Sequence, residues 1–430
     1  MISENEVKVL SLIEEHQSGI IDFLQQLIRY RTITPPDNGR AESNDYRDLQ
    51  NFVANALQGI GCSLEMWDAD ASELDIFPGC GVKPDRDLSN MPVLAGKLPG
   101  SGGGNSLILN GHYDVVPVGL LANWHYDPFE GQVADGRLYG RGACDMKSGI
   151  AAMIQALRFI QQSGIELKGD LIIQTVPDEE ASCMGTLSCC QRGYTADAAI
   201  IPEPTNMQLF VALRGSLYGK ITVYGRAGHA EMSQPHWSEG GAVNAITKAA
   251  KVIEALEDLN DQWRTQREKQ HRYLDPDIIT PTVIHGGDWS VTYPEKVEIT
   301  FGSNFIPSTH NKREEIEAQL GRVAALDPWM RANPPKLDAD GEWWYGAEAS
   351  ENEAIVQLGK EVLSELGITP TLGGFGTLTD AIHLINYSKI PTISFGPSIR
   401  TAHMADEFVT IAELVKTTQA LALLILRWCG

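Results

Sequence analysis

The chain has 430 residues, more than one compact core usually holds, so about two domains are expected. Hydrophobic residues make up 43% of the chain and charged residues 21%, which excludes a disordered or a membrane-embedded protein. The formal net charge of −22 argues against nucleic acid or an anionic membrane as a partner and favours a small molecule.

The first ten residues, MISENEVKVL, contain two glutamates and no apolar core. No later stretch is apolar over the length of a membrane-spanning helix. The seven cysteines contain no CxxC pair, which argues against a disulfide framework and a structural zinc site. We therefore expect reduced cysteines and a cytoplasmic protein.

Hydrophobic periodicity predicts helix over residues 7–30, broken near Ser18 and Gly19, and again over 46–60. The segment GKLPGSGGGN, residues 96–105, predicts a loop. From Ser106 onward, short apolar strands alternate with helices, which is typical of an α/β sheet. The predicted strands are SLILN, DLIIQTV, DAAIIPE and KIPTISFGP, and the best-supported helix covers 148–162.

The pattern of predicted strands and helices changes near Arg214. Strands are predicted over 216–228 and 291–305, helices over 240–259 and 312–325, and a possible last strand over 334–340. This order suggests a small α+β unit inserted into the larger domain. We expect a catalytic domain formed by 1–213 and 342–430, with the inserted unit covering 214–341.

Polar side chains follow the predicted strands at the points where these strands end. Ligands of an open α/β sheet bind at the carboxyl ends of its strands, so these side chains should meet at one edge. Two imidazoles and several carboxylates match the nitrogen and oxygen ligands that hold two divalent ions such as zinc, cobalt or manganese. The residues in these positions are His112, Asp114, Asp178, Glu179, Glu180, Glu203 and His403, with Asp145 just ahead of the helix over 148–162.

Six motifs now carry a family resemblance: NGHYDVVP, GRGACDMKSG, PDEEASCMGT, IPEPT, GRAGHAE and GPSIRTAHMADE. Together they resemble the superfamily of two-metal hydrolases that includes aminoacylase, acetylornithine deacetylase, succinyl-diaminopimelate desuccinylase and glutamate carboxypeptidase. The resemblance covers nearly the whole chain, and the pattern is most similar to the acetylornithine deacetylase-like branch. It implies a zinc-exopeptidase-like α/β catalytic domain with an inserted α+β domain that acts as a lid or in dimerisation.

The resemblance also implies a role for each matching residue. One ion, most simply zinc, would be held by His112, Asp145 and Glu203. The other ion would be held by Glu180 and His403, with Asp145 bridging the two. Asp114 would orient the His112 imidazole by a hydrogen bond, and Glu179 would be the general base that takes a proton from water.

Two further positions concern the inserted unit. His229, in GRAGHAE, resembles the histidine that members of this family bring to the reacting oxyanion, and His236 could compete for this role. Relatives often pair through the inserted unit, so a homodimer is expected.

The expected substrate is shaped by a departure from the family pattern. Asn304 stands where relatives that act on amino-acid derivatives often carry an arginine that grips a carboxylate, and Arg214 or Arg400 could replace it. We therefore predict deacylation or deformylation of a small metabolite at a C–N bond. A metallo-exopeptidase and a deaminase of an activated amine remain open alternatives, whereas a non-catalytic metal-binding scaffold is disfavoured because Glu179 is present.

Overall fold

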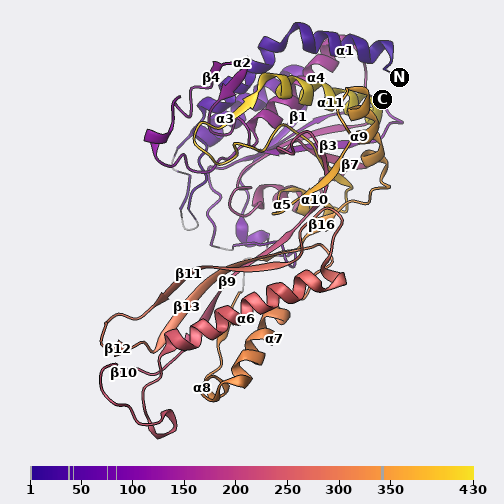
Figure 1. The fold of residues 1–430 in the computed structure, drawn as a ribbon. Helices are drawn as coiled ribbons and strands as arrows, with labels where there is room; N and C mark the ends of the chain where they lie inside the picture. The colour runs from indigo at the N-terminus through magenta and orange to yellow at the C-terminus, as the bar shows by residue number, and fades with distance from the viewer. Residues whose placement is uncertain (1, 37–38, 42, 75, 84, 340–342) are drawn as a thin grey trace. The chain divides into compact units, whose positions relative to one another are not determined.

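The computed structural model describes residues 2–36, 39–41, 43–74, 76–83, 85–339 and 343–430 (Figure 1). The chain forms two compact units. The larger consists of Met1–Ala212, Glu348–Gly374 and Thr379–Gly430, and the smaller of Leu213–Ala347 and Phe375–Leu378. No described helix combines the length and apolarity needed to cross a membrane. All seven cysteines are free thiols.

The larger unit is built on a mixed sheet with the strand order β1–β2–β6–β3–β7–β18–β8–β16, and β17 pairs with β8. The central strands β6, β3, β7 and β18 run parallel, whereas β1, β2 and β8 are antiparallel to their neighbours. The parallel order brings the carboxyl ends of the central strands to one edge. The strands are β1 (Ser63–Trp67), β2 (Val93–Leu98), β3 (Leu107–His112), β6 (Leu171–Val176), β7 (Ala198–Ile201), β8 (Leu209–Leu213), β16 (Ala347–Glu348), β17 (Leu372–Phe375) and β18 (Thr392–Ser394).

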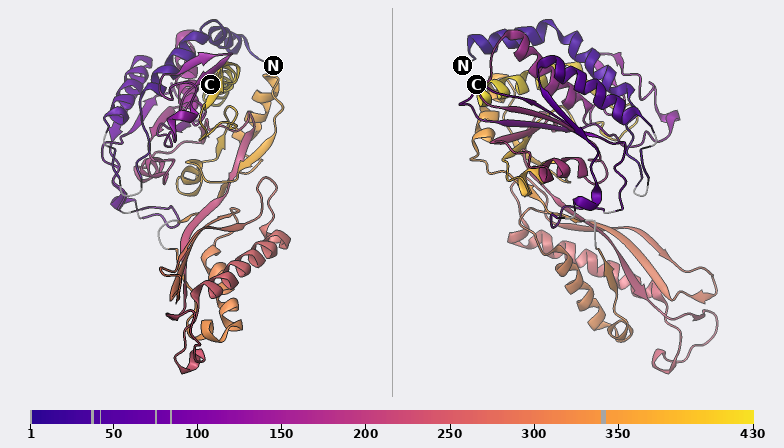
Figure 2. Two further views of the ribbon diagram at one scale, coloured as in Figure 1. Left: turned by 60° about the vertical axis from the view of Figure 1, so that its left-hand side comes forward. Right: turned by 180° about the vertical axis from the view of Figure 1, so that it is seen from behind.

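Helices cover both faces of this sheet (Figure 2). One face carries the group in which α4 packs against α1, α2, α3 and α11, and α9 packs against α11, while α5 and α10 pack together on the other face. This matches the near-continuous burial of β3 and β6, because a sheet covered on both sides needs apolar side chains on both. The helices are α1 (Glu4–Glu15), α2 (Gln17–Arg29), α3 (Asp45–Ile60), α4 (Lys147–Ser163), α5 (Met184–Gln191), α9 (Ala354–Glu365), α10 (Ala381–Asn386) and α11 (Ile411–Cys429), with short 3-10 turns η1 (Ala71–Glu73) and η2 (Leu121–Asn123).

Two sequence expectations needed correction here. The helix predicted over 7–30 is indeed two helices, but the break falls at His16, which ends α1, rather than near Ser18 and Gly19. Gly96–Leu98 were assigned to a loop but continue β2, because Gly96 lies between Leu64 of β1 and Ile173 of β6 in the ladder.

A small separate sheet in the larger unit has the order β19–β5–β4. Phe408 of β19 pairs with Tyr139 of β5, which joins the chain segment before Asp145 to the segment after His403. Two loops that the sequence separates are thus held side by side. The strands are β4 (Gln132–Ala134), β5 (Arg137–Tyr139) and β19 (Phe408–Thr410).

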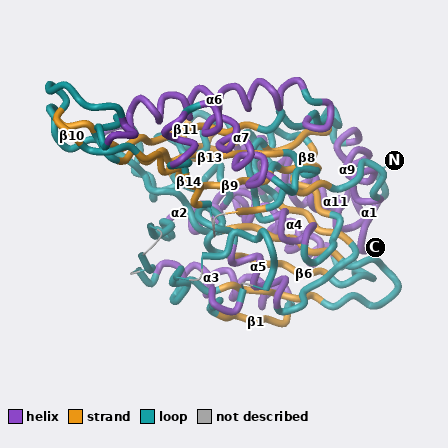
Figure 3. Tube along the Cα trace, turned by 90° about the horizontal axis from the view of Figure 1, so that it is seen from below, coloured by secondary structure: helices purple, strands orange, loops and turns teal. Residues whose placement is uncertain are grey.

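The smaller unit has a sheet of order β11–β13–β9–β14, with β15 also paired to β9, and a separate β10–β12 pair. The helices α6 and α7 pack their apolar sides onto this sheet, where Leu256 and Ile316 join Ile221 and Ile299 in one core (Figure 3). The elements are β9 (Gly215–Tyr224), β10 (Gly228–His229), η3 (Trp237–Glu239), α6 (Ala245–Thr265), η4 (Arg267–Lys269), β11 (Ile278–Gly286), β12 (Thr292–Tyr293), β13 (Lys296–Phe305), α7 (Lys312–Leu326), α8 (Pro328–Ala332), β14 (Lys336–Asp338) and β15 (Trp343–Trp344).

The smaller unit begins at Leu213, one residue before the predicted insertion, and it extends past the predicted end at residue 341. Residues 343–347 and 375–378 group with the smaller unit, although we expected them in the catalytic domain. Trp343 and Trp344 pair with β9, so strand pairing extends the smaller sheet past the predicted end. The strand predicted over 334–340 is β14, and residues 340–342, which include the predicted end of the insertion, lie outside the described residues.

Candidate metal centre

The residues predicted as metal ligands all lie in the larger unit and come from different elements. His112 is the last residue of β3, Glu180 follows β6, Glu203 follows β7, Asp145 precedes α4, and His403 lies in the loop between β18 and β19. Because these strands share one carboxyl edge, the structure brings the five side chains together.

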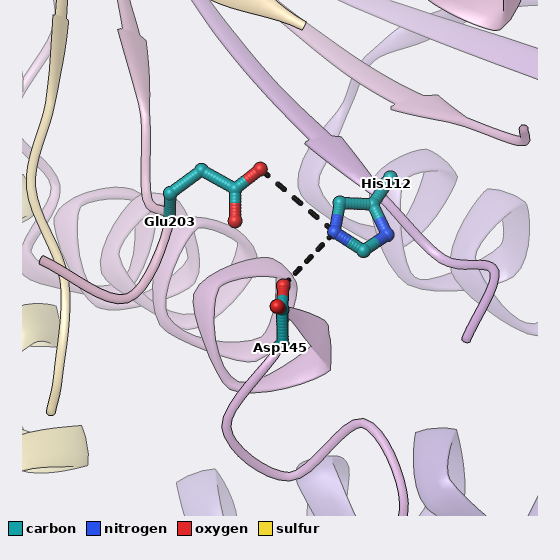
Figure 4. A group of neighbouring side chains, drawn as sticks. All are labelled: His112, Asp145 and Glu203. Carbon is teal, nitrogen blue, oxygen red and sulfur yellow. Dashed lines mark hydrogen bonds and ion pairs between the residues drawn. The ribbon is translucent and has the colours of Figure 1, made fainter. Parts of the chain in front are cut away.

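The first group of candidate ligands is His112, Asp145 and Glu203 (Figure 4). The Nε2 atom of His112 lies 3.1 Å from Oδ1 of Asp145 and 3.8 Å from Oε1 of Glu203. The ligand atoms of the group lie within 4.8 Å of one another, so one ion could contact all three.

The second group is Asp145, Glu180 and His403. The Nε2 atom of His403 lies 3.1 Å from Oε2 of Glu180 and 3.5 Å from Oδ2 of Asp145. Asp145 therefore offers one carboxylate oxygen to each group. This is the arrangement that a carboxylate bridging two cations requires.

In each group, one buried carboxylate oxygen lacks a hydrogen-bond partner. Oε1 of Glu180 and Oε1 of Glu203 are buried, and neither has a hydrogen-bond partner among the described residues. Burial raises the pKa of Glu203 well above its usual range, and Asp145 adds repulsion although His112 opposes it. A divalent cation would supply the missing positive charge, and the donor set of imidazole and carboxylate suits zinc, cobalt or manganese.

Glu179 lies beside the two groups, with Oε2 3.8 Å from Nε2 of His112. Burial raises its pKa well above the usual range, and the nearby carboxylates of Glu203 and Glu180 act in the same direction, against His112. A buried carboxylate with a raised pKa is suited to accept a proton from water and to give it back.

Asp114 supports the site differently from our expectation. Nδ1 of His112 lies 3.0 Å from the backbone oxygen of Asp114, whereas its distance to the carboxylate is 3.6 Å, too long for a hydrogen bond. The carboxylate instead accepts hydrogen bonds from Thr34 Oγ1 and from the backbone N–H groups of Glu179 and Glu180. The main chain of Asp114 thus orients the imidazole, and its side chain fixes the segment that carries the base.

A buried ion pair that the sequence did not reveal supports Asp145. One oxygen of Glu407 accepts from the backbone N–H groups of Gly142, Cys144 and Asp145, and the other accepts from Arg141. Gly142 has a φ of 85°, and a Cβ there would lie 2.8 Å from a methyl group of Val115, so this turn needs glycine. Arg141 and Glu407 stand inside the motifs GRGACD and HMADE, which was the available signal.

Two other buried acids lie near the centre, and only Asp178 was among the residues that the sequence singled out. Asp178 accepts two hydrogen bonds from the buried Arg86, which also binds the carbonyl oxygens of Pro35 and Pro36. Asp380 is fully buried, and burial raises its pKa to about 7, with Asp114 repelling it and His112 opposing the rise. Nothing in TLTDAIH marks Asp380 by sequence, because only the fold places it near the other acids.

The predicted residues of the inserted unit lie in the smaller unit. His229 is exposed on β10, where its Nδ1 accepts from the backbone of Glu231, and His236 caps η3. Asn304 donates to Ser216 Oγ across neighbouring strands.

The two arginines considered as replacements at the Asn304 position differ in exposure. Arg214 is buried and donates to the carbonyl oxygen of Pro276, whereas Arg400 is exposed. Burial also lowers the pKa of Arg214 from its ordinary value. One nitrogen of Arg214 thus binds the main chain at Pro276, while its Nε is buried without a hydrogen-bond partner among the described residues.

Comparisons with known proteins agree with this architecture. The family model described as peptidase family M20/M25/M40 matches residues 108–427. N-formyl-4-amino-5-aminomethyl-2-methylpyrimidine deformylase of Halalkalibacterium halodurans is 31% identical and covers 98% of this chain and 97% of its own length. Succinyl-diaminopimelate desuccinylase of Methylobacterium radiotolerans is 31% identical over 92% of this chain and 93% of its own length.

Among solved structures, aminopeptidase PepT from Bacillus cereus superposes with a TM-score of 0.71 at 18% identity, covering 96% of this chain and 99% of that one. At this identity the match shows the fold alone. It confirms the predicted α/β fold with a smaller additional domain, and the relatives confirm the resemblance to the acylase and desuccinylase superfamily.

Proposed function

Since the chain belongs to peptidase family M20/M25/M40 and is a metal-dependent hydrolase of carbon–nitrogen bonds, we propose that it removes the formyl group from a small N-formyl amine. Two deformylases, from Halalkalibacterium halodurans and Bacillus subtilis, are 31% and 30% identical over 98% and 97% of the chain. The relatives named as deformylases act on a pyrimidine that carries the formylated amine, so this is the substrate class to test first.

The observation that carries the proposal is the position of Asp145 between two ligand groups, with Glu179 next to them. We propose that His112, Asp145 and Glu203 hold one divalent cation and that Asp145, Glu180 and His403 hold a second, most simply zinc. Cations held there supply Lewis-acid chemistry, which acidifies water and polarises a carbonyl group.

The protein's own residues carry the proton. Glu179 accepts a proton from water as the water oxygen attacks the formyl carbon. When the C–N bond breaks, Glu179 returns the proton to the departing nitrogen, so the products are formate and a free amine. Asp114 holds the backbone of Glu179 in place during both transfers.

Asn304 favours a neutral formyl group over a succinyl group. A succinyl substrate carries a free carboxylate, which is best recognised by a bidentate cationic partner. The side chain at this position is a neutral amide that already donates to Ser216. Desuccinylation, peptide hydrolysis and release of ammonia from an activated amine are therefore the competing outcomes.

The test is an assay of the metal-loaded protein with N-formyl amines, N-succinyl amino acids, dipeptides and aromatic amines, in which formate, succinate, amino acid and ammonia are measured. Glu179→Gln should lower kcat on the formyl substrate by about 10²–10⁴-fold while leaving the bound metal unchanged. Glu15→Gln, at an exposed glutamate of α1, is the matched control. Turnover without formate release, or full activity of Glu179→Gln, would reject the proposal.

We also propose a homodimer formed through the smaller unit. β11 is an edge strand, and Val283 and Ile284 on it are exposed, as is Ile246 of α6. An apolar edge strand is suited to pair with a second copy of itself. Ile284→Lys should convert a dimer to a monomer in analytical ultracentrifugation, and a wild-type chain that sediments as a monomer would reject this arrangement.

His229 is proposed to stabilise the oxyanion, and its replacement by alanine should lower kcat without loss of metal. A cytoplasmic location, in keeping with the free thiols, remains part of the same proposal.

A further inference from the structure

His125 and Asp406 form an ion pair between segments that lie far apart in the sequence. Nδ1 of His125 lies 2.5 Å from Oδ2 of Asp406, and the backbone N–H of His125 donates to Oδ1 at 2.7 Å. The imidazole is 85% exposed, so it has little packing role of its own.

Asp406 belongs to the loop that carries His403. Both residues have left-handed backbone, with φ of 54° for Asp406 and 62° for His403. This conformation is unfavourable for residues with a side chain, and it persists only where surrounding contacts hold it. The loop therefore depends on its anchors to present His403.

The loop is anchored in the interior at Met404 and Glu407, which stand on either side of Asp406. Arg141 donates to the backbone oxygen of Met404 and pairs with the buried Glu407, which binds the backbone leading to Asp145. The guanidinium of Arg141 also lies over the ring of Trp124, 5.3 Å from its centroid. The segment that carries His125 is thus tied to the same anchor.

Between these two anchored residues of the loop, Asp406 is held by His125. We infer that the His125–Asp406 pair positions His403, and so sets the affinity of the second cation position at Asp145, Glu180 and His403. His125 and Asp406 are positioning residues, because neither side chain is in the candidate ligand groups. The inference rests on the proposed two-cation centre.

A positioning role and a purely structural role predict different results for His125→Ala. A purely structural role predicts a lower urea midpoint of unfolding, whereas a positioning role predicts weaker metal binding alone. An exposed ion pair contributes little to global stability, so His125→Ala should leave the urea midpoint of unfolding unchanged. The substitution should lower only the affinity for the cation that His403 would hold. Loss of a group that supports a metal ligand typically lowers metal affinity by about 10–100-fold.

The experiment is a titration of metal-stripped full-length protein with Co²⁺, followed by calorimetry and by visible absorption. The wild-type chain should bind two ions, and His125→Ala should keep one affinity and lose about 10–100-fold in the other. Its cobalt spectrum should resemble that of His403→Ala. His125→Asn should restore binding, because the asparagine amide can donate from near the Nδ1 position.

Two variants complete the design. His16→Ala, at an exposed histidine that contacts none of the candidate ligands, should titrate as wild type. Asp406→Asn keeps a side chain that tolerates positive φ but removes the charge, and it should weaken the same ion as His125→Ala.

Each failure has its own signature. Wild-type affinities for both ions in His125→Ala would overturn the inference, as would an equal loss of both affinities together with a lower urea midpoint. A wild-type chain that binds a single ion would overturn the two-cation proposal itself, and the inference with it.

Discussion

The two units bury charge in opposite ways. In the smaller unit, Asp277 is 1% exposed and accepts hydrogen bonds from Lys312, Thr309 and the backbone of Ile306, with Lys269 3.1 Å away. In the larger unit, the carboxylates around Asp145 outnumber the cationic side chains near them.

This difference in charge balance distinguishes the structural cluster at Asp277 from the candidate binding site at Asp145. A buried carboxylate that is paired and fully hydrogen-bonded stabilises a fold once both partners are in place. Buried carboxylates without such partners are unfavourable by themselves, and a protein retains them where a ligand supplies the missing charge. Arg86 with Asp178 and Arg141 with Glu407 show that the larger unit also balances its acids wherever they serve only as supports.

The largest expected effect comes from removing the shared ligand. Asp145→Asn should weaken both cation positions by more than about 100-fold, since it alters the residue that both groups share. Hydrolysis should be lost with them. His403→Ala should weaken one position alone, and calorimetric titration of the two variants distinguishes these outcomes. If Asp145→Asn, like His403→Ala, lowered the affinity at one cation position alone, a shared role for Asp145 would be contradicted.

The next effect tests the balanced cluster. Asp277→Ala removes the fully buried carboxylate 2.7 Å from Lys312 and leaves that lysine with the more exposed Glu315 at 3.3 Å, which should lower the free energy of unfolding of the smaller unit by about 3–5 kcal/mol. Urea denaturation followed by hydrogen exchange of α7 measures this loss. Cobalt binding should not change, and a loss below about 1 kcal/mol would show that the cluster is not a structural anchor.

Replacing Asp380 is expected to raise the free energy of unfolding, whereas replacing Asp277 lowers it. Its raised pKa of about 7 means that the folded state, without bound cations, holds a proton that the unfolded state releases near pH 4. Stability from this group is therefore present below about pH 4 and is lost as pH rises towards 7. Asp380→Asn should stabilise the chelated protein at pH 7 by ~1 kcal/mol, the scale of one pKa unit, and less at pH 5.

The smallest effect is the acid response of the smaller unit. Burial opposes ionisation of Asp277, but Lys312 outweighs it and the pKa lies below the usual range. A depressed pKa stabilises the fold above the ordinary aspartate value of about 3.9, and this contribution is lost as pH falls through the folded value. Hydrogen exchange of β13 between pH 5 and 2 should show this loss of stability. In Asp277→Ala, the part of the acid response that comes from Asp277 should be absent.

The sequence determined the elements and the candidate ligands because both are local properties. Apolar runs gave the central strands β3, β6, β7 and β18, and the candidate ligands lie at the ends of these strands, in the loops that follow them, or before a helix. Local patterns could not show that Gly96 continues a strand or that Trp343 extends the smaller sheet, since strand pairing decides both.

Only the tertiary structure decided how the site is supported. It gave the orienting hydrogen bond of His112 to the backbone of Asp114, and it brought His125 to Asp406 across 281 residues of chain. Such contacts depend on where the packed sheet and helices place distant segments. No periodicity or spacing along the chain shows which distant segments will come into contact. The residue types of the centre follow from the sequence, whereas the imbalance of charge around Asp145 arises from folding.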